Sequence, residues 1–479
     1  MSRQPYLRLN FRGQRPGQRP TASQLVEAIR DQVQGGSSLE GCRLPPVRVL
    51  AHQLGVAKGT IEGVYDELKA QGVVESRDRQ GLFIAPRDPE VEVPELARVP
   101  RLALKELSSY QPTAASRPGV LQLSAVFIDP RILPRDRLAA CFRSVLKSPG
   151  MPGLYDTQGY PPLRDWIAER LRGRGIDAHA DHVVITNGSQ QALDIVMRMA
   201  ATDTVATESP AYFIGKYLLQ LSGMRAVGLP VDPFQGLDLA RWEALLRRHR
   251  PGLVYLTTNF QNPSGYSYST RELSHICRWS QEHGFGILED DWGSDMLSYS
   301  EFRPSLRALG GENVLYMNSF TKKLLPSLRI GYLLGSEANV DALVMGKRVA
   351  TLGVPAMMEA GLYEFLDRGY YETFLRSVQR ELDLRYRRCL DLLDRLMPEP
   401  VRWTTPGGGP ILWLELPRSV SIPQLAARLA AEQVVIEDSE DAFFDEPHLH
   451  GFRIGYAFLD ADEMEQALTR LAKGIRALL

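Results

Sequence analysis

The sequence is poor in the features that would place a chain outside the aqueous interior of a cell. It has four cysteines in 479 residues, Cys42, Cys141, Cys277 and Cys389, which lie far apart and form no CxxC pair. They predict neither a disulfide framework nor a cysteine metal site. No apolar run is long enough to span a membrane, and the basic N-terminus lacks the apolar core of a signal peptide. We therefore expect a cytoplasmic protein with reduced thiols, no metal and no membrane partner.

The chain also lacks a net charge that would favour one class of partner, because its formal net charge is -1. The charge is unevenly distributed. Residues 1–88 contain 11 Arg and 2 Lys against 9 Asp and Glu, a net charge of +4, which leaves the remainder near -5. A small basic module on an acidic body is a weak indication of nucleic-acid binding, and a solvated surface would look the same. The length exceeds one hydrophobic core, so we expect two or three domains.

The first 86 residues have the pattern of three short helices followed by a hairpin. Apolar residues recur at helical spacing in three segments, and two β-rich runs then flank a polar turn that contains glycine. In the second helix the spacing places Val49, Leu50 and Leu54 inward. The segments are 21–34, 44–56, 57–72 and, for the hairpin, 73–86. This order predicts a winged helix-turn-helix domain over residues 1–86.

Four residues of this module are candidates for contacts with DNA. In a helix-turn-helix the second helix of the motif lies in the major groove, with its N-terminal residues near base edges and phosphates. Here that N-terminus holds Lys58, which can reach a phosphate or a guanine, and Thr60, which can donate a hydroxyl. Arg48 faces outward from the preceding helix, and Gly81 at the wing tip would let the backbone approach a groove. For Arg48 and Lys58 an ordinary solvated surface is the alternative.

The segment from Leu44 to Ala85 resembles the GntR-type winged-helix DNA-binding domain nearly throughout. The resemblance implies that double-stranded operator DNA is a partner. The family usually has arginine where this chain has Lys58, and lysine lacks the bidentate fork of arginine. Base specificity at that position is therefore less well supported than general DNA affinity. The matching positions are Leu44-Pro45 with Arg48, Leu50-Ala51, Leu54-Gly55-Val56, Lys58 with Thr60, Tyr65 and Gly81.

Beyond the module, the chain changes character twice. Residues 87–118 are rich in proline and charge, which predicts an extended linker. In residues 119–479 apolar strand-like runs alternate with amphipathic helices, which is typical of an α/β domain with a mainly parallel sheet and helices on both faces. A strand at 411–416 and a short αβ tail predict a smaller C-terminal lobe. The strands of the main sheet are expected at 182–186, 204–208, 225–231, 253–258, 285–290, 314–320 and 329–335.

The stretch SFTKKLLPSLRIGYLLG, residues 319–335, places two adjacent lysines where the chain enters a strand. Such a lysine is usually a surface residue with a buried stem. It can also be the amine that forms a Schiff base with a carbonyl cofactor. The lysine alone does not decide between these readings. The decision depends on whether the chain also supplies the other groups that pyridoxal phosphate requires.

Candidates for the phosphate and the ring nitrogen of that cofactor are present. A phosphate needs donors at a helix N-terminus, and Ser189 and Gln190 follow a strand and open a helix. Arg329, seven residues after the first lysine, can also hold phosphate. The ring nitrogen needs an anion to stay protonated, and Asp290 and Asp291 end a strand.

The chain also has candidates for contacts with the ring of the cofactor. Asn262 can donate to the phenolic oxygen, and Tyr212 can cover the ring face. Each group alone has a structural explanation, such as a turn for Asn262, a helix cap for Ser189 and a loop for the aspartates. Five groups in this order favour a cofactor site.

From about Pro118 to the C-terminus this order resembles the fold type I aminotransferases. With the N-terminal module, the chain resembles a MocR-type regulator, the GntR subfamily that joins a winged helix to an aminotransferase-like domain. Residues 155–176, YDTQGYPPLRDWIAERLRGRGI, are similar to the family's Gly-x-x-x-Leu-Arg segment. Residues 319–332 match its Ser-Phe-Ser/Thr-Lys-x-Leu-x-Pro-x-Leu/Met-Arg-Ile/Leu-Gly-Tyr pattern. That register selects Lys322 as the Schiff-base lysine and adds Ser319 as a phosphate ligand.

The resemblance implies three further assignments near the cofactor. Arg453, in GFRIGYAF, would bind the α-carboxylate of an amino acid, for which its bidentate fork is suited. A buried structural ion pair is the alternative for this arginine. The family pattern favours Asp290 over Asp291 as the partner of the ring nitrogen. Trp292 stands where the family has tyrosine, which removes a hydroxyl near the cofactor.

The function that the resemblance implies is transcription regulation. The domain that carries pyridoxal phosphate would sense an amino-acid-like effector or pyridoxal phosphate itself. The alternative is a pyridoxal-phosphate-dependent aminotransferase with an accessory DNA-binding module, and the winged helix favours the regulator because an enzyme has no need for it. The resemblance also implies a homodimer, with a tyrosine near position 155 reaching across the interface. Swapping of the DNA heads over the partner's body is an option for that dimer.

Overall fold

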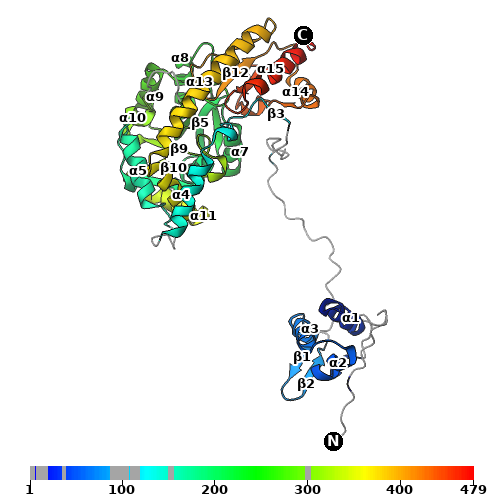
Figure 1. The fold of residues 1–479 in the computed structure, drawn as a ribbon. Coiled ribbons are helices and arrows are strands. Elements are labelled where there is room, and N and C mark those ends of the chain that lie inside the picture. The colour runs from blue at the N-terminus through cyan, green and yellow to red at the C-terminus, as the bar shows by residue number, and fades with distance from the viewer. Residues whose placement is uncertain are drawn as a thin grey trace. The chain divides into compact units, whose positions relative to one another are not determined.

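The computed structural model divides the chain into two compact units, Met1–Leu104 and Lys105–Leu479, which we describe separately (Figure 1). The structure describes residues 6, 20–34, 39–86, 107, 119–148, 156–296 and 304–479. The predicted linker at 87–118 lies outside these residues apart from Leu107, and so does Tyr155.

The N-terminal unit is a three-helix domain with a hairpin wing. Its helices are α1 (Ala22–Gln34), α2 (Val47–Leu54) and α3 (Lys58–Ala70). Strands β1 (Val74–Arg77) and β2 (Gly81–Ile84) pair antiparallel. The predicted winged helix-turn-helix is confirmed.

The core of this unit comes from all three helices and the wing, and includes Leu25, Leu50 and Ile61. The hydroxyl of Tyr65 on α3 donates to the Pro45 carbonyl at 2.8 Å, which fixes α3 against the start of α2. The expectation that Val49 points inward is wrong, because 42% of this residue is exposed. Helix α2 has only two turns, and its buried residues are Leu50 and Ala51, so Val49 falls on the outer side.

The C-terminal unit is built on a seven-stranded sheet in the order β4-β10-β9-β8-β7-β5-β6. Strand β10 is antiparallel to both of its neighbours, and the other pairs are parallel. Each strand that the sequence predicts for this sheet is present. The bounds are β4 Val183–Thr186, β5 Thr204–Ser209, β6 Arg225–Pro230, β7 Leu253–Leu256, β8 Gly286–Asp290, β9 Val314–Ser319 and β10 Gly331–Leu334.

Helices cover both faces of this sheet, which explains why its strands read as continuous apolar runs. Successive residues of one strand enter different cores. Val183 and Ile185 on β4 pack in the core that contains Leu163 of α5, whereas Val184 packs in the core that contains Leu193 of α6. The helices are α4 Arg135–Lys147, α5 Pro161–Arg172, α6 Ser189–Met199, α7 Phe213–Ser222, α8 Leu239–His249, α9 Thr270–His283, α10 Leu306–Gly310, α11 Val340–Thr351, α12 Ala356–Asp367 and α13 Tyr370–Leu396.

A smaller lobe forms the C-terminal part of this unit, as the sequence predicts. Its antiparallel sheet has the order β11-β12-β14, and a short parallel pair joins β3 to β13. Strand β3, early in the unit, is therefore paired with a strand of the C-terminal lobe. The elements are β3 Leu121–Gln122, β11 Arg402–Trp403, β12 Ile411–Glu415, α14 Ile422–Ala431, β13 Val434–Val435, β14 Gly451–Gly455 and α15 Ala461–Arg476.

The topology brings several predicted site residues to one edge of the main sheet. The carboxyl ends of the parallel strands point to the same edge, where ligands of open α/β sheets bind. Asp290 ends β8 and Ser319 ends β9. Gly331, at the start of β10, pairs with both Ser319 and Thr186, so the end of β4 lies there too. None of the helices that the structure describes has both the length and the hydropathy needed to cross a bilayer.

Candidate functional site

Lys322 and Lys323 follow β9 and occupy very different surroundings. Lys323 is only 2% exposed, and its Nζ donates to Asp295 Oδ2 at 2.5 Å and to Asn318 Oδ1 at 2.6 Å. Lys322 Nζ lies 3.8 Å from the ring centroid of Phe127 and has no hydrogen bond or ion pair to the residues that the structure describes. Only the amine of Lys322 is therefore available for chemistry.

The surroundings of Lys322 also make its amine a better nucleophile. Burial lowers the pKa of Lys322 to about 7, and the nearby guanidinium groups of Arg453 and Arg329 act in the same direction. A large fraction of this amine is thus neutral near pH 7, and only the neutral form has a lone pair with which to attack a carbonyl carbon.

Asp290 has an unused hydrogen-bond acceptor at the end of β8. Its Oδ2 accepts a hydrogen bond from Tyr255 Oη at 3.1 Å. Its Oδ1 is buried and has no hydrogen-bond partner among the residues that the structure describes. Burial raises the pKa of Asp290 to about 7. A buried carboxylate with an open oxygen suits a cationic N–H donor, which would satisfy both its charge and its lone pair.

Asp291 has the opposite character. Both of its oxygens accept hydrogen bonds from side chains, and one of the donors is a guanidinium. This aspartate therefore has a structural role, and its oxygens have little hydrogen-bonding capacity left for a ligand. Its donors are Arg174 Nη2 at 2.9 Å, Tyr316 Oη at 2.7 Å, Ser294 Oγ at 2.6 Å and Asn259 Nδ2 at 3.2 Å.

A small cradle of donors lies at the N-terminus of α6. Gly188, the N-cap residue, has φ 76° and gives the helix no side-chain cap. A Cβ on Gly188 would lie 3.0 Å from Arg329 Nη2 and 3.3 Å from Thr321 Oγ1. The Thr321 hydroxyl is buried, and the structure describes no partner for it. Helix N–H groups, a guanidinium and a free hydroxyl around one point are suited to an anion.

Four other residues predicted for the cofactor lie around this cradle. Ser189 is the first residue of α6, and Gln190 Oε1 accepts a hydrogen bond from Tyr212 Oη at 3.1 Å. Ser319 Oγ donates to the Ile330 carbonyl at 3.2 Å and accepts from the Thr321 amide at 3.0 Å. The Ser319 hydroxyl thus shapes the lysine turn, whereas the neighbouring Thr321 hydroxyl is free.

Two residues of this site were missed from the sequence, Thr321 and Tyr255. The motif that selects Lys322 accepts only Ser or Thr at the position of Thr321, which was a signal for it. Tyr255 had no such signal, because its contact with Asp290 joins two neighbouring strands of the sheet.

Arg453 lies on β14 and is 9% exposed. Its Nε donates to the Ser124 carbonyl at 2.9 Å, and its Nη1 donates to Asn262 Oδ1 at 2.9 Å. Its Nη2 forms a close ion pair with Glu437. The arginine is therefore next to Asn262, whose side-chain amide nitrogen has no hydrogen-bond partner among the described residues. The arginine also has the ion pair that is the alternative to a ligand.

Trp292, in the position of the family's tyrosine, is buried in the core that contains Phe260. Its Nε1 donates to the Phe260 carbonyl at 3.2 Å. The indole N–H is thus used by the backbone and does not replace the missing hydroxyl.

The candidate DNA-contact residues of the winged helix are accessible. Lys58 begins α3, with 54% of its side chain exposed, and its Nζ lies 3.2 Å from Glu62 Oε1 one turn along the helix. Arg48 on α2 is exposed, and Thr60 is partly buried. Gly81 is exposed and begins β2 with φ 110°. An exposed pair such as Lys58–Glu62 contributes at most about 1 kcal/mol, so a phosphate can displace Glu62 easily.

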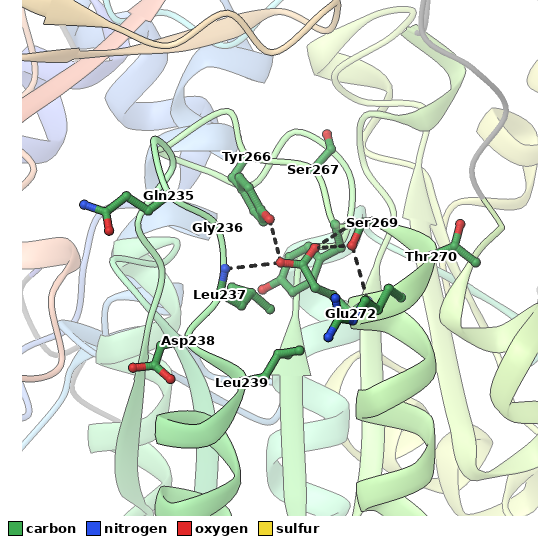
Figure 2. Close-up of a pocket in the computed structure, with 12 residues that line it drawn as sticks. Gln235, Gly236, Leu237, Asp238, Leu239, Tyr266, Ser267, Ser269, Thr270 and Glu272 are labelled. Atoms are coloured by element: carbon green, nitrogen blue, oxygen red, sulfur yellow. Dashed lines mark hydrogen bonds between the residues drawn. The ribbon is translucent and has the colours of Figure 1, made fainter.

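A separate cavity of about 760 Å³ lies where the chain leads into α8 and α9 (Figure 2). None of the residues predicted for the cofactor lines it. Glu272 accepts hydrogen bonds from Tyr266 Oη at 2.7 Å, from the Leu237 amide at 3.2 Å and from Ser269, with which it forms the capping box of α9. The Glu272 carboxylate thus links the loop before α8 to the start of α9.

Comparison with known proteins agrees with this geometry. Residues 135–471 match the family model "Aminotransferase class I and II", and residues 21–84 match "Bacterial regulatory proteins, gntR family". The chain is 31% identical to a 2-aminoadipate transaminase of Thermus thermophilus over 371 residues, which are 76% of this chain and 92% of the relative.

Other relatives match nearly the whole chain. The probable rhizopine catabolism regulatory protein MocR of Rhizobium meliloti is 28% identical over 474 residues, 96% of this chain and 94% of the relative. An uncharacterised HTH-type transcriptional regulator of Bacillus subtilis, YisV, is 25% identical over 477 residues, 96% and 97% of the two chains.

Among solved structures, the α-aminoadipate aminotransferase LysN of Thermus thermophilus, crystallised with N-(5'-phosphopyridoxyl)-L-leucine, matches with a TM-score of 0.71 and 30% identity. The match covers 75% of this chain and 93% of LysN. The chain therefore belongs to the class I and II aminotransferase family, and a GntR-type winged helix precedes that domain, as in the MocR-like transcription regulators.

Proposed function

We propose that this DNA-binding regulator carries pyridoxal phosphate on Lys322 and senses an amino-acid-like effector at the same site. The single observation that carries the proposal is the pair formed by Lys322, whose amine is unengaged, and Asp290, whose Oδ1 is a buried acceptor without a partner. Neither feature benefits an empty protein, because an unsatisfied buried carboxylate destabilises the fold. The open oxygen of Asp290 is what a cationic aromatic nitrogen requires, and the amine of Lys322 is what a carbonyl carbon requires.

The residues present fit pyridoxal phosphate at each of its polar groups. The cradle at the N-terminus of α6, with Arg329 and Thr321, suits the phosphate. Asp290 suits the ring nitrogen. The amide nitrogen of Asn262 suits the phenolic oxygen, because the Asn262 carbonyl oxygen is already bonded to Arg453. Tyr212, bonded to Gln190, would cover the ring and border the phosphate.

Each of these residues has a defined task in the proposed mechanism. When bound, the cofactor supplies a carbonyl carbon that amines attack and a ring that withdraws electrons from that carbon. Lys322 provides the neutral amine. Asp290 keeps a proton on the ring nitrogen by holding a negative charge beside it. Arg453 orients the incoming amino acid by its carboxylate, and the hydroxyl and N–H donors at α6 hold the phosphate end.

The proposal extends to assembly and to DNA. We infer a homodimer that reads two operator half-sites, with the DNA heads swapped over the partner's body as one possible arrangement, in the cytoplasm where chromosomal DNA lies. Effector binding alters DNA binding only if the effector favours one arrangement of the domains over another in free energy. Light scattering at micromolar concentration tests the dimer, and a monomeric mass would contradict it.

The first experiment is to record the visible absorbance of the protein with pyridoxal phosphate while a panel of amino acids is added, beside the Lys322→Ala variant. We expect an absorbance band from the covalent bond to Lys322 that the variant lacks. One amino acid should shift this band to a new species that persists. No band in the wild-type protein would refute the role of Lys322.

Transamination is the second candidate function, and the relation to the 2-aminoadipate transaminase favours it. The same titration separates the two. In a transaminase the shifted band would decay, and a keto acid would restore it. In a sensor it would remain, and the amino acid that causes it would then change the affinity for operator DNA.

A further inference from the structure

The guanidinium of Arg453, which the proposed function assigns to the carboxylate of the ligand, already binds a carboxylate of its own chain. Its Nη2 pairs with Glu437, and its other two nitrogens donate to Ser124 and Asn262. The side chain of Arg453 is 11% exposed, whereas that of Glu437 is 38% exposed. The glutamate is therefore the more accessible member of the ion pair.

The backbone around this ion pair is held by hydrogen bonds, whereas the side chain of Glu437 is partly exposed. Ser124 Oγ accepts a hydrogen bond from the backbone amide of Glu437 at 3.0 Å and donates one to the Arg453 carbonyl at 2.9 Å. Just before these residues, Val435 pairs with Gln122 in the β3–β13 ladder. Three distant segments are thus joined at Ser124, so the carboxylate of Glu437 can rotate away while the peptide stays in place.

The ion pair lies close to the reactive end of the site. Arg453 bonds Asn262, and the charges of Arg453 and Glu437 both act on Lys322, which places them near its amine. A ligand amine that reaches the carbon held by Lys322 would carry any α-carboxylate towards Arg453. That carboxylate and the Glu437 carboxylate would compete for the same N–H donors.

From this geometry we propose that Glu437 is a built-in competitor for the carboxylate of the ligand and thereby determines specificity. The inference rests on the proposed function of the site. An α-amino acid must displace Glu437 from Arg453, and the displaced side chain turns towards solvent. An amine without a carboxylate leaves the ion pair intact. In that complex Glu437 continues to neutralise the charge of Arg453. The site therefore accepts both classes of ligand, and Glu437 reduces the preference for amino acids.

The test uses two stable adducts that differ only in the carboxylate, N-(5'-phosphopyridoxyl)-L-alanine and N-(5'-phosphopyridoxyl)ethylamine. Their affinities for the cofactor-free full chain are measured by titration calorimetry, which needs no catalysis. In Glu437→Gln the alanine adduct should bind about tenfold more tightly than in wild type, because it no longer displaces an anion. The ethylamine adduct should change by less than about twofold, because it does not contact the pair.

Two further variants complete the experiment. Glu440→Gln removes an exposed acidic residue three positions away and should leave both affinities unchanged, which excludes a general charge effect. Glu437→Asp keeps the charge on a shorter arm and should give an intermediate ratio, so the inference stays testable if Glu437→Gln folds poorly.

The outcomes separate this inference from the function on which it rests. If both adducts bind but their affinity ratio is the same in wild type and Glu437→Gln, Glu437 does not compete and the inference is wrong. If Glu437→Gln weakens the alanine adduct, the glutamate positions the arginine, and the inference is also wrong. If neither adduct binds the wild-type protein, the proposed function fails and the inference fails with it.

Discussion

Lys58 in the winged helix and Lys323 in the aminotransferase-like unit have the same charge in opposite surroundings. The side chain of Lys58 is 54% exposed and its partner Glu62 is exposed too, whereas Lys323 is 2% exposed and Asp295 is largely buried. Interactions between surface charges are screened by salt, and each exposed ion pair contributes little to stability by itself. Buried charges depend on the few groups packed against them, as Asp295 depends on Lys323 and Arg170, and removing such a partner is expensive. Lys58 thus belongs to a surface charge that salt can screen, whereas Lys323 belongs to a buried network with Asp295 and Asn318.

The two units can be compared experimentally in one protein. All six tryptophans, Trp166, Trp242, Trp279, Trp292, Trp403 and Trp413, lie in the C-terminal unit. Tryptophan fluorescence therefore follows unfolding of that unit alone, while DNA titrations and hydrogen exchange report on the winged helix.

The largest effect is expected from Lys323→Ala. This variant leaves Asp295 buried without its ammonium partner, and although burial by itself would raise the pKa of Asp295, Lys323 and Arg170 hold it well below its usual range. We expect a loss of about 3–5 kcal/mol in the free energy of unfolding, measured by urea denaturation with tryptophan fluorescence. Lys322→Ala is the matched control and should lose less than about 1 kcal/mol, because its amine has no ion pair. Equal losses for the two adjacent lysines would contradict the assignment.

A smaller effect with a distinctive pH dependence is expected from Asp290→Asn in the cofactor-free protein. Burial raises the pKa of Asp290 from 3.8 to about 7, so between these pH values the native state binds a proton that the unfolded state has lost. This contribution to stability is present below pH 4 and is lost as the pH rises through 7. At pH 8 the variant should therefore be about 1–3 kcal/mol more stable than wild type, although it should bind the cofactor weakly.

Asp291→Asn provides the contrast for that measurement. Its carboxylate accepts from Arg174 and three other side chains, so this variant should lose stability at pH 8. If both variants changed stability in the same direction, the distinction between an open and a saturated aspartate would fail.

The charges of the winged helix should show their effect in salt dependence. For mixed-sequence duplex DNA, Lys58→Ala should reduce the slope of log affinity against log salt by about 1, because one phosphate contact is lost. Lys69→Ala, in the last turn of the same helix, should leave the slope unchanged. Identical slopes for wild type and Lys58→Ala would remove Lys58 from the interface.

The smallest effect concerns the wing. Gly81 has φ 110°, and a Cβ there would lie 3.2 Å from Arg43 Nε, so Gly81→Ala should destabilise the β1–β2 hairpin by about 1 kcal/mol. Faster hydrogen exchange of the hairpin amides measures it. Gly59→Ala, on α3 with open space around it, should instead be neutral or stabilise by a few tenths of a kcal/mol. Similar exchange rates for Gly81→Ala and wild type would show that no special backbone is needed at the wing.

Much of the fold follows from local patterns that the sequence displays directly. The strands of the main sheet were predicted because both of their faces are buried, which produces continuous apolar runs. The order of Ser189, Asp290 and Lys322 at strand ends was also visible, because parallel strands bring their carboxyl ends to one edge. The motif register alone separates Lys322 from Lys323, and the structure gives the physical reason in the ion pair of Lys323 with Asp295.

Other features were decided only by tertiary contacts. Val49 is exposed because the two turns of α2 bury only Leu50 and Ala51. Asp290 is open and Asp291 saturated because of which residues surround each side chain, although the two are adjacent in the chain. Glu437 had no motif, and its pairing with Arg453 arises where β3, β13 and β14 meet. Periodicity and motifs record the neighbours along the chain, whereas hydrogen-bond saturation and ion pairing depend on segments that only folding brings together.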